Sequence, residues 1–394
     1  MQNDIIIAGS ARTPMGGFQG DLGDATAPEL GATAIKAALE RSGLDPSKVD
    51  EVLMGCVLPA GLGQAPARQA SIGAGIPLAT GCTTVNKMCG SGMKATMLAH
   101  DLIAAGTNDV MVAGGMESMS NAPYLLDKAR DGYRMGHGGV FDHMFLDGLE
   151  DAYDKGRLMG TFAEDTARHY QFTREAQDAF AIRSLKRAQR ATDDGSFATE
   201  IASHVVRARK GDVEVVIDEQ PGKANLDKIP KLKAAFHAEG TVTAANSSSI
   251  SDGAAALVLA RASVASDLGL QTRARIVGHT THAQEPAWFT TAPVAAISKL
   301  LDRTGWSSDD VDLYEINEAF AVVTMAAIRE LGLDEEKVNI NGGACALGHP
   351  IGASGARIIV TLLSALERHN LKRGIAALCI GGGEATAIAI ERLG

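Results

Sequence analysis

The sequence predicts an α/β fold in which two copies of one unit pack as a layered α-β-α-β-α sandwich, with a loop domain inserted between them. The first observation is an internal repeat. Residues 29–56 and 292–317 each read as an amphipathic helix, a glycine, a polar turn and an apolar strand that opens with Val-Asp. Gly43 and Gly305 lie at matching places in the two copies. The second observation is that strands alternate with helices, which is typical of a sheet covered on both faces.

The elements of the first copy follow in order. We expect a strand at 4–9, a helix and a strand within 29–56, then a strand, a glycine-rich turn and a helix around 84–92, and a strand at 109–117. The second copy repeats these elements at 274–278, 292–317, 339–355 and 376–384. Such an alternation predicts a mostly parallel sheet.

The middle of the chain departs from the repeat. It holds a loop rich in glycine, methionine and histidine at 131–144, a pattern that predicts a helix near 161–191, and a lysine-rich segment. Inserted loops on a rigid scaffold commonly carry ligand contacts. We therefore divide the chain into an N-terminal half, an inserted loop domain, a return segment that completes the first half, and a C-terminal half, at 1–119, 120–245, 246–272 and 273–394.

Composition indicates a globular protein of a reducing compartment. The 394 residues are 45% hydrophobic and 21% charged, and no apolar run has the length that crosses a bilayer. The first residues of the sequence contain no basic region or cleavage site, and the last residues do not form a retention or peroxisomal signal. We therefore expect no targeting signal. The five cysteines are odd in number and lack C-x-x-C spacing, which disfavours disulfides and structural zinc. We expect a cytoplasmic protein with no membrane partner.

The charge balance excludes one class of partner. A net charge of −10 disfavours nucleic acid as the general ligand. Residues 183–233 have a positive local charge, with 11 Lys and Arg against 8 Asp and Glu. Two interpretations are open: the charged side chains of this stretch only lie on solvated faces of helices and loops, or they form a landing area, that is, a surface that binds an anionic ligand.

Cys89 is the candidate nucleophile. It follows a β-rich run at 82–86 and precedes Gly90-Ser91-Gly92 and a helix. A cysteine at such a turn meets free backbone N–H groups and the positive end of the helix dipole, which favour the thiolate. The small residues let a substrate approach the backbone closely. A buried structural cysteine is the alternative.

His349 is the candidate base. It lies in the glycine-rich segment 341–355, where Pro350 restricts the turn before the next helix. The repeat places this turn opposite the turn that carries Cys89, and a cysteine beside a histidine is the arrangement of an activated thiol. A structural histidine is the alternative, although the glycines leave little core around it.

Two further residues lie at strand ends. Cys379 precedes Gly381-Gly382-Gly383, and the carboxyl ends of strands in such sheets hold ligands while a glycine-rich exit offers N–H donors to an oxyanion. That Cys379 is only a buried core cysteine is an equally good interpretation. Asn317 ends a strand and starts a helix, where it is a site residue or only an N-cap. No G-x-G-x-x-G follows the first strand and no Walker lysine occurs, which disfavours a nucleotide-binding fold.

Taken together, these motifs resemble those of the thiolase family. The resemblance covers essentially the whole chain, in the order of the family, and its motifs are 85–92, 113–120, 317–320, 341–355 and 379–383. It implies a thiolase-like fold of duplicated α/β domains, with an inserted loop domain that contacts coenzyme A.

The resemblance implies acyl transfer to and from coenzyme A by a ping-pong Claisen condensation or thiolysis, in which two acetyl-CoA exchange with acetoacetyl-CoA and CoA. Cys89 would form the thioester, His349 would take its proton and later help bind a thioester oxygen, and Cys379 would be the second acid/base. Asn317 would hold a water that completes the oxyanion site with His349. The backbone N–H groups of Cys89 and Gly381 would form a second oxyanion hole. No cofactor or metal is implied, because CoA thioesters are substrates.

The resemblance also implies a tunnel for the CoA arm and makes 183–233 a landing area for its phosphates. The tunnel would be lined by Ser248, Leu149, Met159, Phe236, Ala244, Ala319 and Phe320. Leu158 stands where a short-chain biosynthetic member has His, and 220–223 lacks the arginine that such members offer to adenine. Further departures are Ser249 and Ser251 in place of Gly and Asn, and Glu384 where Met is frequent. These departures leave the chain-length preference and the nucleotide contacts open.

Three alternatives stay open at this point: a degradative 3-ketoacyl-CoA thiolase of broader chain range, a decarboxylating condensing enzyme of the ketoacyl synthase kind, and a non-catalytic acyl-CoA-binding scaffold. We also expect the loop 131–144 to mediate contacts in a homodimer or homotetramer. The physiological direction and the pathway do not follow from these residues.

Overall fold

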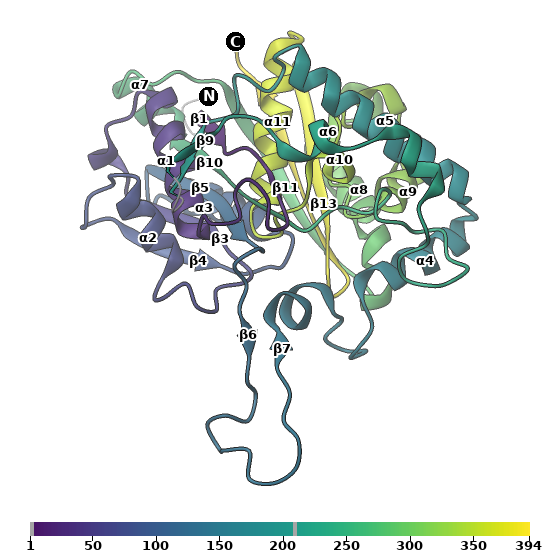
Figure 1. Cartoon of the computed structure of the whole chain (residues 1–394). Helices are drawn as coiled ribbons and strands as arrows, with labels where there is room; N and C mark the ends of the chain where they lie inside the picture. The colour runs from purple at the N-terminus through teal and green to yellow at the C-terminus, as the bar shows by residue number, and fades with distance from the viewer. Residues whose placement is uncertain (1–3, 208–210) are drawn as a thin grey trace.

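The two repeats form the two halves of one sheet in the computed structural model, which describes residues 4–207 and 211–394 (Figure 1). The ten strands are β1 (Ile5–Arg12), β2 (Gly16–Gly17), β3 (Glu51–Gly55), β4 (Gly81–Val85), β5 (Val110–Ser118), β10 (Ser251–Arg261), β11 (Ala274–Ala283), β12 (Leu313–Ile316), β13 (Arg373–Ile380) and β14 (Glu384–Arg392). Their order is β12-β13-β14-β11-β1-β10-β5-β3-β4, with β2 paired to β10.

The duplication predicted from the sequence is present in this order. The halves join where β1 pairs antiparallel with β11, with Ile6 opposite Arg275 and Ile7 opposite Ala274. From this junction outward, β1-β10-β5-β3 on one side matches β11-β14-β13-β12 on the other.

The expectation of a mostly parallel sheet is wrong. Parallel pairing occurs between β3 and β4, between β3 and β5, and between β12 and β13. In each half one strand returns antiparallel between its neighbours, β10 in the first and β14 in the second. β14 follows β13 after only three residues, and a connection of that length joins antiparallel strands.

Helices cover the two half-sheets in the layered arrangement that the sequence predicts. They are α1 (Ala27–Ser42), α2 (Pro66–Gly73), α3 (Ser91–Ala104), α8 (Ala292–Thr304), α9 (Ala321–Leu331) and α11 (Ser354–Arg368). α1 and α2 cover the outer face of the first half, α8 and α9 that of the second, and α3 and α11 pack side by side between the halves. The five layers therefore run α-β-α-β-α.

The glycines that revealed the repeat end equivalent helices. Gly43 follows α1 with φ 70° and Gly305 follows α8 with φ 68°, the left-handed conformation that stops a helix and suits glycine. At its other end α1 begins with a capping box between Thr26 and Glu29. The glycine signal is local, which explains why it could be identified in the sequence, whereas the capping box was not predicted.

The insertion fills the interval between β5 and β10. Its elements are β6 (Tyr124–Leu125), β7 (Phe141–Asp142), a π-helix η2 (Phe145–Leu149), α4 (Met159–Tyr170), α5 (Arg174–Asp193), β8 (His204–Val206), β9 (Val213–Val215), α6 (Glu219–Lys223) and a 3-10 helix η3 (Leu226–Lys231). The single helix expected near 161–191 is two helices. Gln171 has φ 54°, which ends α4, and Thr173 caps α5.

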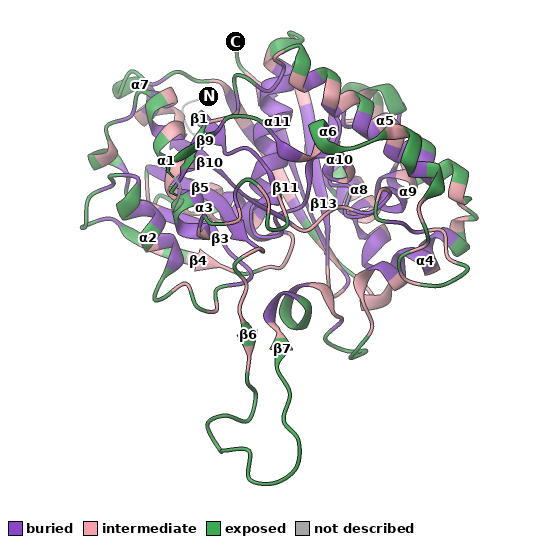
Figure 2. Ribbon diagram, viewed as in Figure 1, coloured by how far each residue is buried: buried purple, intermediate pink, exposed green. Residues whose placement is uncertain are grey.

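The segment between β6 and β7 projects as a long arm from the body of the molecule, and Figure 2 shows it exposed along its length. Met135, which lies in this segment, is 97% exposed.

The remaining short elements connect the main ones. They are η1 (Pro46–Lys48), α7 (Ala262–Asp267), η4 (Pro286–Thr291), η5 (Ser308–Asp310), η6 (Glu335–Lys337) and α10 (Ala344–Leu347). Among the helices of the described residues, none is both long enough and apolar enough to span a bilayer. The four-part division of the chain into domains stays a prediction.

Candidate active site

Three residues named from the sequence meet in one cavity of about 380 Å³: Cys89, His349 and Gly381. Cys89 lies in the turn before α3, His349 in the turn before α11, and Gly381 in the turn between β13 and β14. The turn with Cys89 belongs to the N-terminal repeat, and the turns with His349 and Gly381 belong to the C-terminal repeat. Equivalent turns of the two halves therefore share a wall of the same cavity, as the repeat predicts.

The turn that carries Cys89 is tight. Met88, directly before it, has φ 47°, an uncommon conformation for a residue with a side chain. Hydrogen bonds hold it there: Met88 N–H donates to Asn86 Oδ1 at 3.0 Å, and Ser91 Oγ donates to the Met88 carbonyl at 2.6 Å. The strain is thus imposed by neighbours at the point where the sulfur is presented, a pattern that is frequent at functional sites.

The Cys89 thiol is protonated in this environment. Burial raises its pKa to about 11, although a hydrogen bond from the Gly381 N–H opposes the shift. The sequence-based expectation that the turn favours the thiolate is therefore outweighed by desolvation. The sulfur needs a base to become a nucleophile.

His349 has the protonation state of such a base. Burial, reinforced by the positive charge of Arg357, lowers its pKa to about 3, so the imidazole is neutral. Its Nδ1 lies 2.6 Å from Ser354 Oγ, and Ser354 Oγ donates to the Pro350 carbonyl at 3.0 Å. Because the hydroxyl has one proton, it accepts from Nδ1–H. Nε2, for which the described residues supply no hydrogen-bond partner, then has the free lone pair.

Asn317 lies beside the imidazole. It follows β12, is 1% exposed, and places Nδ2 at 3.5 Å from His349 Nδ1. Its backbone N–H is held by the Ala377 carbonyl at 3.0 Å. Its Oδ1 is buried and finds no hydrogen-bond partner within the described part of the chain. Buried polar atoms are rarely left unpaired, so this amide is suited to a polar ligand.

Cys379 lies at the end of β13, behind the cavity wall. It packs in a cluster that includes Phe289, Ala319 and Phe320, which themselves line the cavity. Burial raises the pKa of its thiol, and the nearby Cys89 raises it further. The two sulfurs are therefore neighbours, although Cys89 alone forms part of the wall.

All seven residues that were expected to contact the CoA arm line the same cavity. They are Ser248, Leu149, Met159, Phe236, Ala244, Ala319 and Phe320. The sequence did not assign a lining role to Phe145, Gly148, Leu158, Gly160, Ala235, Ser247, Ser249, Ile250, Phe289 and Ile351. Most of these are apolar or small and come from several distant stretches, so no local pattern marks them. Leu158 and Ser249 had been noted as departures from the family pattern.

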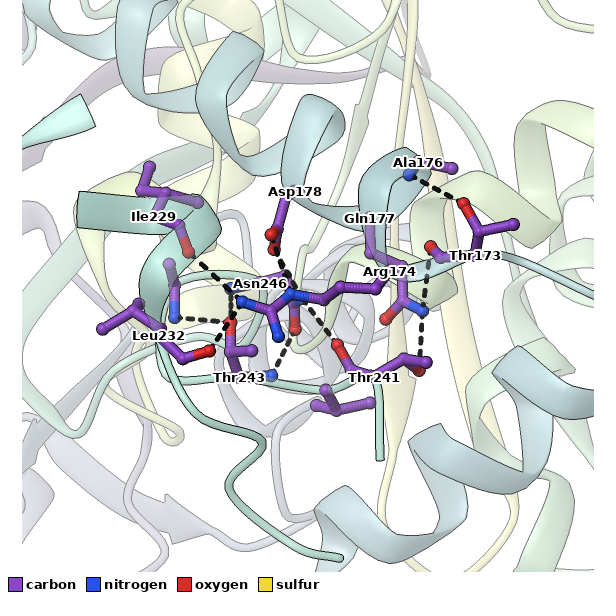
Figure 3. A network of polar contacts seen from close by, with 12 residues as sticks. Thr173, Arg174, Ala176, Gln177, Asp178, Ile229, Leu232, Thr241, Thr243 and Asn246 are labelled. Carbon is purple, nitrogen blue, oxygen red and sulfur yellow. Dashed lines mark hydrogen bonds and ion pairs between the residues drawn. The ribbon is translucent and has the colours of Figure 1, made fainter. Parts of the chain in front are cut away.

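A polar network holds the loop that forms one side of the cavity (Figure 3). Arg174 on α5 donates to Asp178 Oδ2 at 2.7 Å and to the Leu232 carbonyl at 2.8 Å. Asn246 donates to Asp178 Oδ1 at 3.1 Å and to the Thr241 carbonyl at 3.0 Å. The network therefore anchors to α5 the loop that presents Ala244 and Ser248.

Glu117 joins the two halves close to the site. This fully buried carboxylate accepts the backbone N–H groups of Val57 at 2.9 Å, Leu58 at 3.1 Å and Gly352 at 2.8 Å. Burial raises its pKa to about 7 despite these bonds. Gly352 lies three residues after His349, so the contact fixes the histidine turn against the first half. Sequence reasoning did not single out Glu117 for this position.

Much of the basic stretch 183–233 is engaged within the protein. Its ion pairs include Arg183 with Glu335, Arg187 with Glu336, Arg190 with Asp194, and Lys223 with both Glu219 and Asp21. Lys228 lines a second cavity of about 230 Å³, which shares Ala244 with the first. Arg209 and Lys210 lie outside the described residues.

One group of side chains among the described residues has the geometry to hold a metal ion, namely His100, Asp101 and His279. Asp101 Oδ1 lies 3.1 Å from His100 Nδ1 and 2.9 Å from His279 Nε2. The trio lies outside the cavity lining, and hydrogen bonds account for its arrangement. That the reaction needs no metal stays a prediction.

Comparisons with known proteins agree with this geometry. Residues 5–263 match the family model for the N-terminal domain of thiolase, and residues 270–392 match the model for its C-terminal domain. Acetyl-CoA acetyltransferase 2 of Arabidopsis thaliana is 52% identical over 394 residues, which cover 99% of this chain and 97% of that protein. Acetyl-CoA acetyltransferase of Cupriavidus necator is 50% identical over 99% of both chains. The structure of acetyl-CoA acetyltransferase from Syntrophomonas wolfei superposes with a TM-score of 0.96 at 41% identity and covers 100% of both chains.

Proposed function

The chain belongs to the thiolase family, and from that premise we propose that it is an acetyl-CoA C-acetyltransferase, which condenses two acetyl-CoA to acetoacetyl-CoA and CoA and catalyses the reverse thiolysis. The observation that carries the proposal is the shared cavity. A nucleophilic sulfur, a neutral imidazole and a glycine N–H face one space whose other walls are mostly apolar. This space suits an acyl thioester on a pantetheine arm.

In the first half-reaction, Cys89 attacks the carbonyl carbon of acetyl-CoA. Its proton passes to Nε2 of His349 as the sulfur–carbon bond forms, and the departing CoA sulfur takes a proton back as the old thioester bond breaks. Because the resting imidazole is neutral, its Nε2 lone pair is free to accept this proton. The N–H groups of Cys89 and Gly381 stabilise the carbonyl oxygen while it is negative.

In the second half-reaction, the proton of the Cys379 thiol passes to Nε2 of His349, and the Cys379 sulfur then takes a methyl proton from another acetyl-CoA. The carbon attacks the acetyl group on Cys89, the carbon–carbon bond forms, and the Cys89–carbonyl bond breaks. Cys89 leaves as a thiolate and takes the proton from Nε2 of His349, which returns both cysteines to thiols and the imidazole to its neutral form. The protonated Nε2 of His349 and a water held by Asn317 donate to the developing enolate oxygen, since removal of such a weakly acidic proton needs a base and an oxyanion site together.

We propose that the phosphates of CoA lie over the lysines of 223–233, beyond the loop that presents Ser248. Support comes from Lys228, which lines the smaller cavity next to the main one. We also propose a cytoplasmic enzyme, because all five cysteines are free, as in reducing compartments.

We further propose a homodimer or homotetramer in which the arm between β6 and β7 contacts a second copy. The arm exposes Met135 and Val140 far from the core, and exposed apolar side chains of this kind are typical of interfaces. Size-exclusion chromatography with light scattering that gave a monomer would contradict this part.

A thiolysis assay across acyl lengths tests the activity. We expect turnover of acetoacetyl-CoA, and transfer of one labelled acetyl group from acetyl-CoA to Cys89. The matched control is Cys89→Ser, which should lack the stable acyl label and the turnover. A large preference for a long-chain 3-ketoacyl-CoA would favour the degradative thiolase instead.

A further inference from the structure

An ion pair joins the two turns that carry the proposed second oxyanion hole. It is formed by Lys87 and Glu384. Lys87 lies two residues before Cys89, and Glu384 begins β14, three residues after Gly381. The pair therefore links the N-terminal half to the C-terminal half beside the reacting sulfur.

The pair is partly sheltered from water. The side chain of Lys87 is 20% exposed and that of Glu384 34% exposed. Open surface pairs contribute little because water and salt screen them, whereas a partly buried pair keeps more of its attraction. This one also connects segments that are almost three hundred residues apart, so it constrains their relative position.

The two turns lie close together. A Cβ added at Gly90 would lie 2.4 Å from Ile380 Cδ1, so the turns already touch there. Gly383 in the second turn has φ 87° and packs against a third segment, where its Cβ would lie 2.4 Å from the carbonyl oxygen of Gln284, just after β11. Glycines permit this approach, yet they also leave the backbone free to move. Each turn has hydrogen bonds of its own, and a side-chain link from one turn to the other adds a direct constraint on their spacing.

We propose that Lys87 and Glu384 are a positioning pair, which sets the distance between the N–H groups of Cys89 and Gly381 in the oxyanion hole. This rests on the proposed function, because it concerns the same hole. Donors act best when they are fixed at hydrogen-bond distance from the oxygen that becomes charged, so a small displacement of one turn weakens stabilisation of the transition state more than binding of the substrate.

The pair also accounts for a departure noted in the sequence. Glu384 stands where the resembling enzymes frequently have Met, and a lone carboxylate beside the site would be unfavourable. Lys87 supplies the matching charge from the opposite turn.

The test is a double-mutant cycle with Lys87→Met, Glu384→Met, the double methionine variant, and the charge exchange Lys87→Glu with Glu384→Lys. We expect each single variant to lower kcat for acetoacetyl-CoA thiolysis about tenfold while KM changes less than twofold. The double methionine variant should be no slower than either single variant, and the exchange should recover at least half of the loss. Additive losses, no recovery, or single variants at the wild-type rate would each overturn the proposal.

A second readout separates this proposal from the function itself. The rate at which iodoacetamide alkylates Cys89 needs no CoA chemistry, and it should fall in both single variants because the thiolate loses the N–H of Gly381. The matched control is Arg273→Met, which breaks the similarly sheltered pair of Arg273 with Glu367 away from the cavity and should alter neither rate. A wild type without turnover would refute the function, while alkylation unchanged by the single variants would refute the pair.

Discussion

Ser354 Oγ lies 2.6 Å from Nδ1 of His349 and donates its own proton to the carbonyl of Pro350. One hydroxyl thereby selects the imidazole tautomer and directs Nε2 to the cavity. Asn317 Nδ2 lies 3.5 Å from the same ring nitrogen, but both nitrogens then carry protons, so Ser354 and not this amide nitrogen is the acceptor. The base of the proposed reaction is thus oriented by a residue that does not line the cavity itself.

Ser354→Ala should slow the reaction by removing this orientation. We expect kcat to fall about ten- to a hundredfold, a part of the 10²–10⁴-fold that a positioned base supplies. The KM for acetoacetyl-CoA should change little, because Ser354 lies outside the cavity lining. Ser364→Ala is the matched control, since Ser364 is also a buried serine of α11 and its hydroxyl finds no partner in the described structure. A variant at position 354 with the wild-type kcat would show that another contact sets the tautomer.

Cys379→Ser should separate the two half-reactions. Cys89 should still accept a labelled acetyl group from acetyl-CoA, because Cys379 lies outside the wall where the thioester forms. Formation of acetoacetyl-CoA should fall at least a thousandfold, because a hydroxyl is far harder to deprotonate than a thiol. Mass spectrometry of the acyl-enzyme and a condensation assay measure the two steps. Cys345→Ser, which changes another poorly accessible thiol, should keep both, and normal condensation in the position 379 variant would make Cys379 a core residue only.

The pH dependence of Cys89 alkylation should report its buried thiol. Only the thiolate reacts, and burial raises the pKa from about 9 to about 11. At pH 7 the fraction of thiolate is therefore far below that of a free thiol, and the alkylation rate should keep rising up to about pH 11. Rates with iodoacetamide from pH 6 to 11, beside glutathione as the reference thiol, measure this. A plateau below pH 8 would mean that the resting enzyme holds a thiolate.

Gly160→Ala should narrow the cavity. A Cβ at this position would lie 2.0 Å from Phe236 Cζ, so the ring must move into the space proposed for the CoA arm. Overpacking of this kind costs about 1–3 kcal/mol, and we expect the KM for acetyl-CoA to rise about tenfold. Gly81→Ala is the control, because its Cβ would meet Glu51 Cγ at an ordinary 3.8 Å. An unchanged KM in the position 160 variant would place the CoA arm elsewhere.

His349 should also make the fold sensitive to acid. Its pKa is about 3 in the folded chain and 6.5 when exposed. Between these values the unfolded chain binds a proton at His349, whereas the folded chain leaves the imidazole neutral. This contribution to stability is complete above pH 6.5 and is lost as the pH falls toward 3. Between pH 7 and 5 the wild type should lose about 2 kcal/mol more of its unfolding free energy than His349→Gln does. Urea unfolding at both pH values measures the difference, and parallel losses would contradict the neutral, buried state of His349.

The sequence by itself determined the duplicated architecture and the chemical centre of the candidate site. The helix-ending glycines and the turns around Cys89 and His349 each depend on a few consecutive residues, and the repeat placed those two turns opposite each other. The sequence analysis did not predict that β10 and β14 run antiparallel to their neighbours. Whether a strand pair is parallel or antiparallel depends on which strands become neighbours in the folded sheet.

Only the tertiary structure decided how these groups behave. Desolvation raises the pKa of Cys89 and lowers that of His349, and burial is a property of the packed chain rather than of any neighbouring residue. The side chains around them come from distant segments, as with Phe289, Gly160 and the pair of Lys87 with Glu384. The sequence determines which reactive side chains the site contains. Their protonation states, the distances between them and the shape of the cavity depend on contacts between distant segments of the chain.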